Sequence, residues 1–142
     1  MYIITEEMKV KLIDEATKML ARSYIPYSGF AVGAALLTRD DQIYTGCNIE
    51  NAALTPGNCA ERTAFFKAVS EGEREFKAIA IVGGKNREVT DYCAPCGVCR
   101  QVMREFCVPE DFVILLARTR DDYKEYSLEE ILPFGFGPES LQ

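Results

Sequence analysis

Apolar residues recur with helical spacing near the start of the chain. Met8, Leu12, Ala16, Met19 and Leu20 recur at helical spacing among many charged residues, which predicts an amphipathic helix with one buried face. Thr5 precedes this stretch and can accept a hydrogen bond from the first turn as an N-cap. We expect this helix to end near residue 24, ahead of a proline.

Continuous apolar runs further along the chain predict strands. They cover residues 30–38, 43–47, 76–82 and 112–117, with a shorter strand at 124–127. Helices are expected at 59–70 and 96–107, and Ser127 with Glu130 forms a capping box for a last short helix at 128–132. Polar loops are expected at 48–58 and 85–92. Strands that alternate with helices indicate an α/β fold around one central sheet, and residues 1–142 are expected to form a single domain.

Composition narrows the chemistry available to the chain. It has 142 residues, 48% of them apolar, and it has neither His nor Trp. A transition-metal site must therefore use Cys, Asp or Glu, and proton transfer near neutral pH cannot use imidazole. The net charge of −6 argues against a nucleic acid polymer as partner, because such binding depends on basic residues that neutralise phosphates. A small, neutral substrate fits this balance better.

The location of the protein is inferred from what the sequence lacks. No apolar run approaches the length of a membrane span, and the N-terminus has neither the basic nor the apolar region of a signal peptide. We therefore expect a cytoplasmic protein with no membrane contact. In a reducing compartment, six cysteines favour metal binding or catalysis over disulfide bonds.

Two cysteine clusters 37 residues apart carry the strongest chemical signal. Cys59 is followed by Glu61, and Cys96 is followed by Cys99 one helical turn later, so two sulfurs can reach one metal. Both clusters stand at expected helix N-termini, where the helix dipole favours the thiolate. Three protein ligands leave a tetrahedral zinc with an open position, as catalytic zinc sites require. Glu61 is then placed to move the protons of a water in that position.

Three thiolates around Zn²⁺ leave a net charge of about −1, which weakens the metal as a Lewis acid. Arg62, which follows Glu61, and Arg100, which follows Cys99, are candidates to donate hydrogen bonds to sulfur as an outer shell around the metal.

Other interpretations of the cysteines remain open from the residues alone. Cys93, three residues before Cys96, could complete a closed four-cysteine structural zinc site, and the Cys-x-x-Cys pair could instead be redox-active. An iron–sulfur binding module is a third possibility. Cys47 and Cys107 are expected to be small buried apolar residues.

The combination of Cys-x-Glu with a later Pro-Cys-x-x-Cys is the signature of zinc deaminases that act on nucleobases. The likeness covers nearly the whole chain, which resembles the small, homotetrameric, zinc-dependent cytidine deaminases. It rests on PYSGFAVGAAL at 26–36, GCNIENAA at 46–53, CAERTA at 59–64, PCGVCRQ at 95–101, LEEILP at 128–133 and Phe136.

This resemblance implies a three-layer α/β/α fold with a mixed five-stranded sheet, a homotetramer, and one Zn²⁺ per chain. It implies that Cys59, Cys96 and Cys99 bind zinc and that Glu61 shuttles protons. The implied substrate contacts are Phe30 on the pyrimidine, Asn48 and Glu50 on the ribose, chiefly its 3′-hydroxyl, the Ala60 backbone on the base edge, and Phe136 over the base in a neighbouring subunit's site.

The reaction implied is hydrolytic deamination of free cytidine and 2′-deoxycytidine to uridine and 2′-deoxyuridine, as in pyrimidine salvage. Zinc-bound hydroxide adds to C4 of the cytosine, Glu61 moves the protons, and ammonia leaves. A deaminase of a cytosine-bearing antibiotic of the blasticidin type is the competing enzyme reading. The segment Asn48-Ile49-Glu50 counts against it because these side chains suit a ribose.

Overall fold

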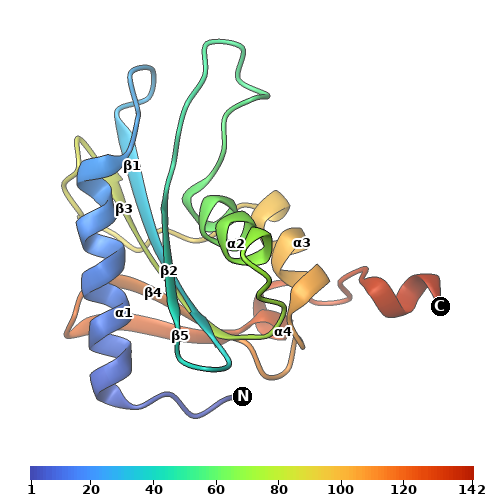
Figure 1. Ribbon diagram of the computed structural model, residues 1–142. Helices are drawn as coiled ribbons and strands as arrows, with labels where there is room; N and C mark the ends of the chain where they lie inside the picture. Colours follow the sequence, from blue (N-terminus) through green and yellow to red (C-terminus); the bar gives the residue numbers. More distant parts are fainter.

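Five strands form one sheet in the order β2-β1-β3-β4-β5 (Figure 1). The computed structural model describes residues 1–142. Only β3 and β4 pair in parallel, and every other neighbouring pair is antiparallel, so the sheet is mixed as the resemblance implies. The strands are β1 (Phe30–Thr38), β2 (Ile43–Cys47), β3 (Phe76–Lys85), β4 (Val113–Thr119) and β5 (Asp122–Ser127).

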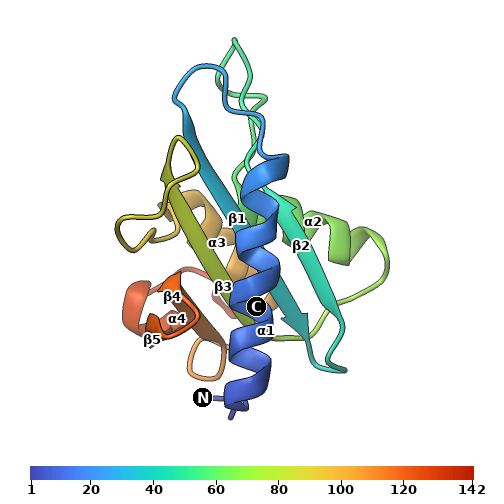
Figure 2. The same cartoon turned by 90° about the vertical axis from the view of Figure 1, so that its left-hand side faces the viewer.

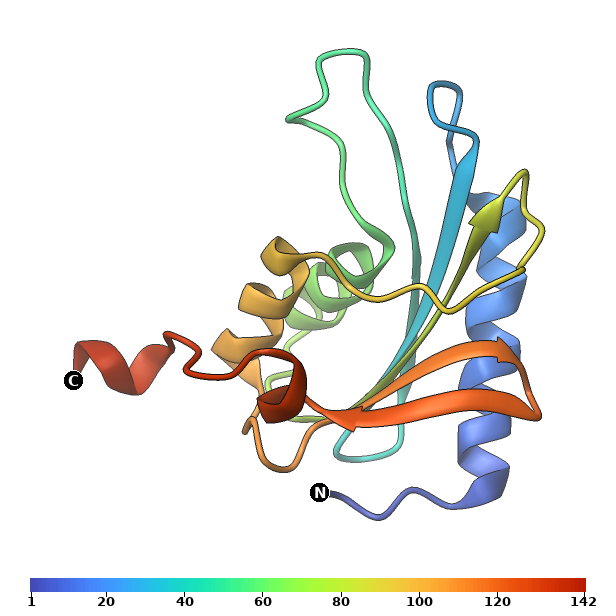
Figure 3. The same cartoon turned by 180° about the vertical axis from the view of Figure 1, so that it is seen from behind.

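Helices cover both faces of the sheet and complete the expected three layers. Helix α1 (Glu6–Lys18) lies along one face (Figure 2), and α2 (Ala60–Ser70) and α3 (Gly97–Phe106) lie on the other (Figure 1). Short turns η1 (Met19–Arg22), α4 (Leu128–Ile131) and η2 (Pro138–Leu141) complete the chain. The loop at 48–58 and the C-terminal segment both extend away from the layers, as Figures 1 and 3 show from opposite sides. None of the helices has the length and apolar character needed to span a membrane.

The central strands carry a separate hydrophobic core on each face. Along β1, Ala34 and Leu36 belong to the core beneath α2 and α3, whereas Ala35 and Leu37 belong to the core beneath α1. The same alternation continues along β3 and β4. Successive strand residues point to opposite faces, so strands buried on both sides appear in the sequence as unbroken apolar runs.

The predicted caps are confirmed. The Thr5 hydroxyl accepts a hydrogen bond from the Met8 amide at 3.1 Å. The capping box of α4 is complete, because Ser127 Oγ accepts from the Glu130 amide at 3.2 Å and Glu130 Oε1 accepts from the Ser127 amide at 2.9 Å. Cys47 and Cys107 are buried and unpaired, as expected.

Several predicted boundaries are wrong. The first helix changes to a 3-10 turn after Lys18 rather than continuing to residue 24. Strand β3 continues through Gly83 and Gly84 because their backbones pair with Val32 and Ala31 of β1. The predicted strand ended at residue 82, before these glycines, but pairing with the partner strand keeps them extended. The η2 turn was not predicted.

Two glycines allow helices to approach the sheet closely. A Cβ atom at Gly33 in β1 would lie 2.0 Å from the carbonyl oxygen of Ala16 in α1. On the opposite face, a Cβ atom at Gly46 in β2 would lie 2.3 Å from the carbonyl oxygen of Ala60 and 2.6 Å from the amide nitrogen of Ala64, both in α2. The first turns of α2 therefore rest directly on the backbone of β2.

We predict that Gly33→Ala lowers the free energy of unfolding by about 1–3 kcal/mol, because the new methyl group meets helix backbone that cannot move aside alone. Urea unfolding followed by circular dichroism measures this change. Gly97→Ala is the matched control, since its Cβ atom would have no neighbour closer than 4.0 Å. Equal losses in the two variants would contradict the close-approach argument.

Candidate metal centre and adjoining pocket

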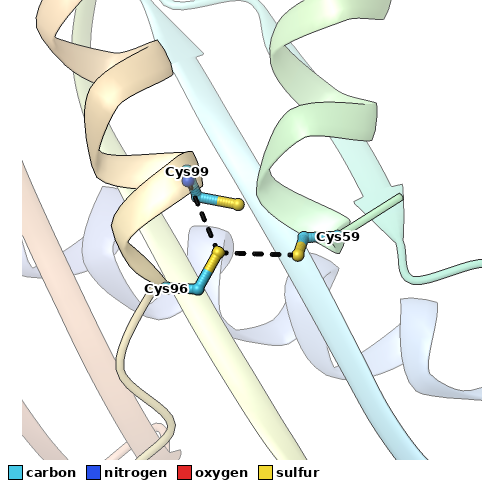
Figure 4. Close-up of side chains that lie close together, drawn as sticks. All are labelled: Cys59, Cys96 and Cys99. Carbon is cyan, nitrogen blue, oxygen red and sulfur yellow. Dashed lines mark hydrogen bonds between the residues drawn. The ribbon is translucent and has the colours of Figure 1, made fainter. Parts of the chain in front are cut away.

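Two helix N-termini meet beside the sheet and bring three cysteines together (Figure 4). Cys59 is the N-cap of α2, Cys96 is the N-cap of α3, and Cys99 lies in the first turn of α3. All three Sγ atoms lie within 4.8 Å of one another, and those of Cys59 and Cys96 are 3.8 Å apart. This is the cluster that the sequence spacing predicted.

Hydrogen bonds within the cluster stabilise negative charge on Cys59. Donation from the Cys99 thiol, from Arg62 and from Cys96 lowers the pKa of Cys59 to about 5, although partial burial opposes the change. The hydrogen bond with Cys59 in turn raises the pKa of Cys99, and burial adds to that rise. Cys59 therefore readily forms a thiolate. Cys99 keeps its proton unless a further positive charge, such as a metal ion, binds beside it.

Glu61 is buried next to these sulfurs. Its side chain is only 4% exposed, within the first turn of α2. Burial raises the pKa of Glu61 to about 7, and the nearby charge of Cys59 contributes to the rise. A carboxyl group with such a pKa can both accept and release a proton near neutral pH. Glu61 can therefore transfer protons near neutral pH, a task often performed by histidine, in a protein that has no histidine.

The residues around the cluster fit a divalent zinc ion. Three convergent thiols form the soft donor set that zinc prefers. Arg62 donates from Nη2 to the Cys59 sulfur at 3.2 Å, so its positive charge offsets part of the negative charge of the sulfurs. Arg100 does not serve in this way, because its guanidinium donates to the carbonyl oxygen of Ile131 at 2.6 Å.

Cys93 stands outside the three-cysteine group. Its thiol packs toward β3, where a Cβ atom at Gly83 would lie 2.8 Å from the Cys93 sulfur. Burial raises the pKa of Cys93 to about 12, so this thiol stays protonated. The closed four-cysteine site considered from the sequence is therefore not formed.

A pocket opens beside the cluster at one end of the sheet. Its volume is about 500 Å³, which falls in the range of small-molecule sites. Cys59 and Arg62 line it on the side of the cluster, and Asn48 and Glu50 line it on the side of the 48–58 loop. The structure thus brings both predicted ribose contacts to the same cavity as a predicted metal ligand.

Asn48 is fixed by the backbone of β1. Its Oδ1 accepts from the Val32 amide at 2.9 Å, and its Nδ2 donates to the Phe30 carbonyl at 2.8 Å. The amide group thereby continues the pairing between β1 and β2 beyond the last strand residue, Cys47. Its second N–H remains available to a ligand. Phe30, at the start of β1, keeps 39% of its surface exposed.

Glu50 is held by the turn that precedes β1. Its Oε1 accepts from the amides of Tyr27 and Ser28 at 3.0 and 3.1 Å, and its Oε2 accepts from the Ser28 hydroxyl. Donation by the Ser28 hydroxyl is the main reason that the pKa of Glu50 lies below its usual value. The carboxylate is therefore ionised and oriented before any ligand arrives.

The two remaining predicted contacts differ in their positions. Ala60 is the first residue of α2, where backbone N–H groups lack acceptors within the helix. Phe136 does not reach the pocket of its own chain. Its ring is 58% exposed, and its carbonyl accepts from Gln101 Nε2 of α3 at 2.8 Å within the projecting C-terminal segment.

The structure adds pocket residues that the sequence reasoning missed. Tyr27, Ser28 and Asn58 line the cavity. Only the match of residues 26–36 to a family segment pointed toward Tyr27 and Ser28. Nothing in the local sequence indicates that Ser28 would meet a carboxylate 22 residues away.

Comparison with known proteins agrees with this geometry. Residues 6–115 match the family described as cytidine and deoxycytidylate deaminase zinc-binding region. A cytidine deaminase of Sporosarcina psychrophila is 50% identical over 131 residues, covering 92% of this chain and 93% of the relative. A cytidine deaminase of Halalkalibacterium halodurans is 48% identical over 130 residues, covering 92% of this chain and 95% of the relative.

Solved structures show the same arrangement of helices and strands. The crystal structure of cytidine deaminase from Burkholderia pseudomallei superposes with a TM-score of 0.82 at 43% identity, covering 94% of this chain and 100% of that one. The structure from Mycobacterium tuberculosis superposes with a TM-score of 0.75 at 37% identity, covering 89% and 95%. From the matched region, the relatives and the three-cysteine cluster together, it follows that this chain belongs to the zinc-dependent cytidine and deoxycytidylate deaminase family.

Proposed function

We propose that this protein catalyses the hydrolytic deamination of free cytidine and 2′-deoxycytidine to uridine and 2′-deoxyuridine, with release of ammonia. The observation that carries the proposal is a buried carboxyl group, Glu61, beside a three-thiol zinc site that borders a pocket of nucleoside size. The names of the relatives, all cytidine deaminases, support the same substrate.

Cys59, Cys96 and Cys99 hold the zinc in this proposal. When bound, zinc supplies a Lewis acid that lowers the pKa of a coordinated water toward neutrality. Glu61 accepts a proton from the attacking water and delivers it to N3 of the cytosine ring, while the water oxygen adds to C4. Glu61 then takes the second proton from the hydroxyl formed at C4 and gives it to the amino group, so the C4 carbonyl forms as the C4–N bond breaks and ammonia leaves. One carboxyl group alternates between base and acid, for which a pKa near 7 is suited.

Asn48 and Glu50, which line the pocket, bind and orient the nucleoside together with Phe30 and Ala60, which do not line it. Asn48 and Glu50 bind the ribose, Phe30 packs on the pyrimidine, and the backbone of Ala60 contacts the base edge. The only arginine or lysine that lines the pocket is Arg62, and Arg62 already donates to the Cys59 sulfur. No free cation remains there for a 5′-phosphate, which favours nucleosides over nucleotides and polymers.

Two further proposals, the single domain and the location, rest on the sequence, and two more, the tetramer and the role of Phe136, rest on the family resemblance. We propose that residues 1–142 act as one catalytic domain, that the protein is cytoplasmic, and that four copies assemble. Phe136 then covers the base in a neighbouring subunit's site. Its exposed ring on a segment that leaves the body of the chain supports this placement (Figure 3).

The central test is turnover of cytidine by the purified protein. We expect cytidine absorbance to fall on incubation, the activity to disappear with a zinc chelator, and added Zn²⁺ to restore it, with about one zinc per chain. A parallel assay with a blasticidin-type antibiotic distinguishes a cytidine deaminase from a deaminase of that antibiotic. Turnover of the antibiotic alone, or a brown iron-containing protein without cytidine turnover, would refute the proposal.

We expect Glu61→Gln to lower kcat by about 10²–10⁴-fold while zinc stays bound, because the amide has the size of the acid but carries no titratable proton. Steady-state kinetics and metal analysis of the same preparation measure both quantities. Glu71→Gln, at the exposed C-terminal end of the same helix, is the control. Full activity of the Glu61 variant would eliminate the proton-shuttle role.

We expect Arg62→Ala to lower kcat/KM about 10- to 100-fold with zinc retained, because loss of the guanidinium leaves the charge of the sulfurs uncompensated. Metal content and kinetics should be measured together. Arg39→Ala serves as the control, since Arg39 forms a surface ion pair with Glu75. Unchanged kinetics in the Arg62 variant would remove this residue from the mechanism.

A further inference from the structure

One serine hydroxyl connects two predicted substrate contacts. Ser28 Oγ donates to Oε2 of Glu50 and also accepts from the backbone amide of Phe30 at 3.0 Å. A hydroxyl can donate one hydrogen bond and accept two, so both contacts are compatible. The proposed ribose ligand and the proposed base-packing residue are therefore joined through a single side-chain atom.

The turn that carries Ser28 is itself held in place from β3. Lys85 Nζ donates to the Ser28 carbonyl, and the Asn86 amide donates to the Gly29 carbonyl at 2.7 Å. Gly29 takes φ +68°, which a residue with a side chain rarely adopts. Figure 1 shows this turn and the 48–58 loop rising at the same end of the sheet. Ser28 thus belongs to a turn that is held in place by hydrogen bonds, and it contacts the 48–58 loop through Glu50.

The two oxygens of Glu50 are held in different ways. Oε1 accepts from two backbone amides, which a Ser28→Ala substitution leaves in place. Oε2 has the Ser28 hydroxyl as its hydrogen-bond partner in the structure. Because Oε1 is held by the two amides, the Ser28 hydroxyl fixes the orientation of the Glu50 carboxylate plane and the direction of the free lone pair on Oε2.

We propose that Ser28 is a positioning residue that orients the Glu50 carboxylate for the 3′-hydroxyl of the nucleoside and ties that orientation to the start of β1 at Phe30. This inference rests on the proposed function. Ser28 need not touch the reacting atoms, because it acts through Glu50. Preorganisation of this kind increases affinity by removing the cost of ordering a mobile side chain on binding.

The test compares Ser28→Ala with wild type on three nucleosides: cytidine, 2′-deoxycytidine and 3′-deoxycytidine. We expect kcat/KM to fall about 10- to 100-fold for the first two, mainly through KM, because a hydrogen bond to a charged group and its orienting effect are lost. For 3′-deoxycytidine, which has no 3′-hydroxyl for Glu50 to accept from, we expect the variant and wild type to agree within about twofold.

Two further variants separate positioning from general damage. Ser28→Thr keeps a hydroxyl and should recover most of the cytidine activity. Ser70→Ala removes a hydroxyl that donates to the Lys67 carbonyl outside the pocket and should match wild type on all three substrates. Zinc content and thermal unfolding should be the same in each variant.

An equal loss on all three nucleosides, or failure of Ser28→Thr to recover activity, would overturn the positioning role. Unchanged KM for cytidine in Ser28→Ala would do the same. Failure of the proposed function looks different, since wild-type protein with bound zinc would then turn over none of the nucleosides.

Discussion

The meeting of two helix N-termini on one face of the sheet is the constraint on which the site depends. Cys59 begins α2, and Cys96 and Cys99 begin α3, so neither helix can move without separating the sulfur atoms. Gly46 sets the depth of α2, because any side chain there would collide with the helix backbone. A residue with no side chain in β2 thereby determines where Cys59 and Glu61 stand.

Charge explains why this cluster needs its neighbours. Three thiols and a carboxyl group lie close together in a partly buried region, and each negative charge makes the next one harder to form. Arg62 supplies a fixed positive charge at one sulfur, and the two helix dipoles favour anions at the same place. Three thiols and the Glu61 carboxyl group can therefore lie close together, because the positive charge of Arg62 is already in place before a metal ion binds.

The sequence was sufficient for most of the fold and for the three-cysteine cluster, for identifiable reasons. Helix periodicity, capping residues and apolar runs are local, and Cys-x-Glu with Cys-x-x-Cys is local within each helix. The approach of Cys59 to Cys96 is a tertiary contact, which the joint presence of the two cysteine motifs and the family resemblance anticipated. The end of β3 was predicted before Gly83 and Gly84, because their pairing with β1 is a tertiary contact that outweighs the low strand preference of glycine. The role of Ser28 was missed because it depends on a hydrogen bond to Glu50, which is distant in the sequence and is brought close only by the fold.

The two separate cores of the sheet have a consequence for how such a protein can change. Residues beneath α1, such as Ala35 and Leu37, point away from α2 and α3. Substitutions there alter the stability of the chain while the opposite layer, which carries the three-cysteine cluster, keeps its packing. Residues in the core beneath α1 can thus be substituted, for example to raise the unfolding temperature, with little effect on the geometry of the three-cysteine cluster. On the other face, changes in packing shift the zinc site itself.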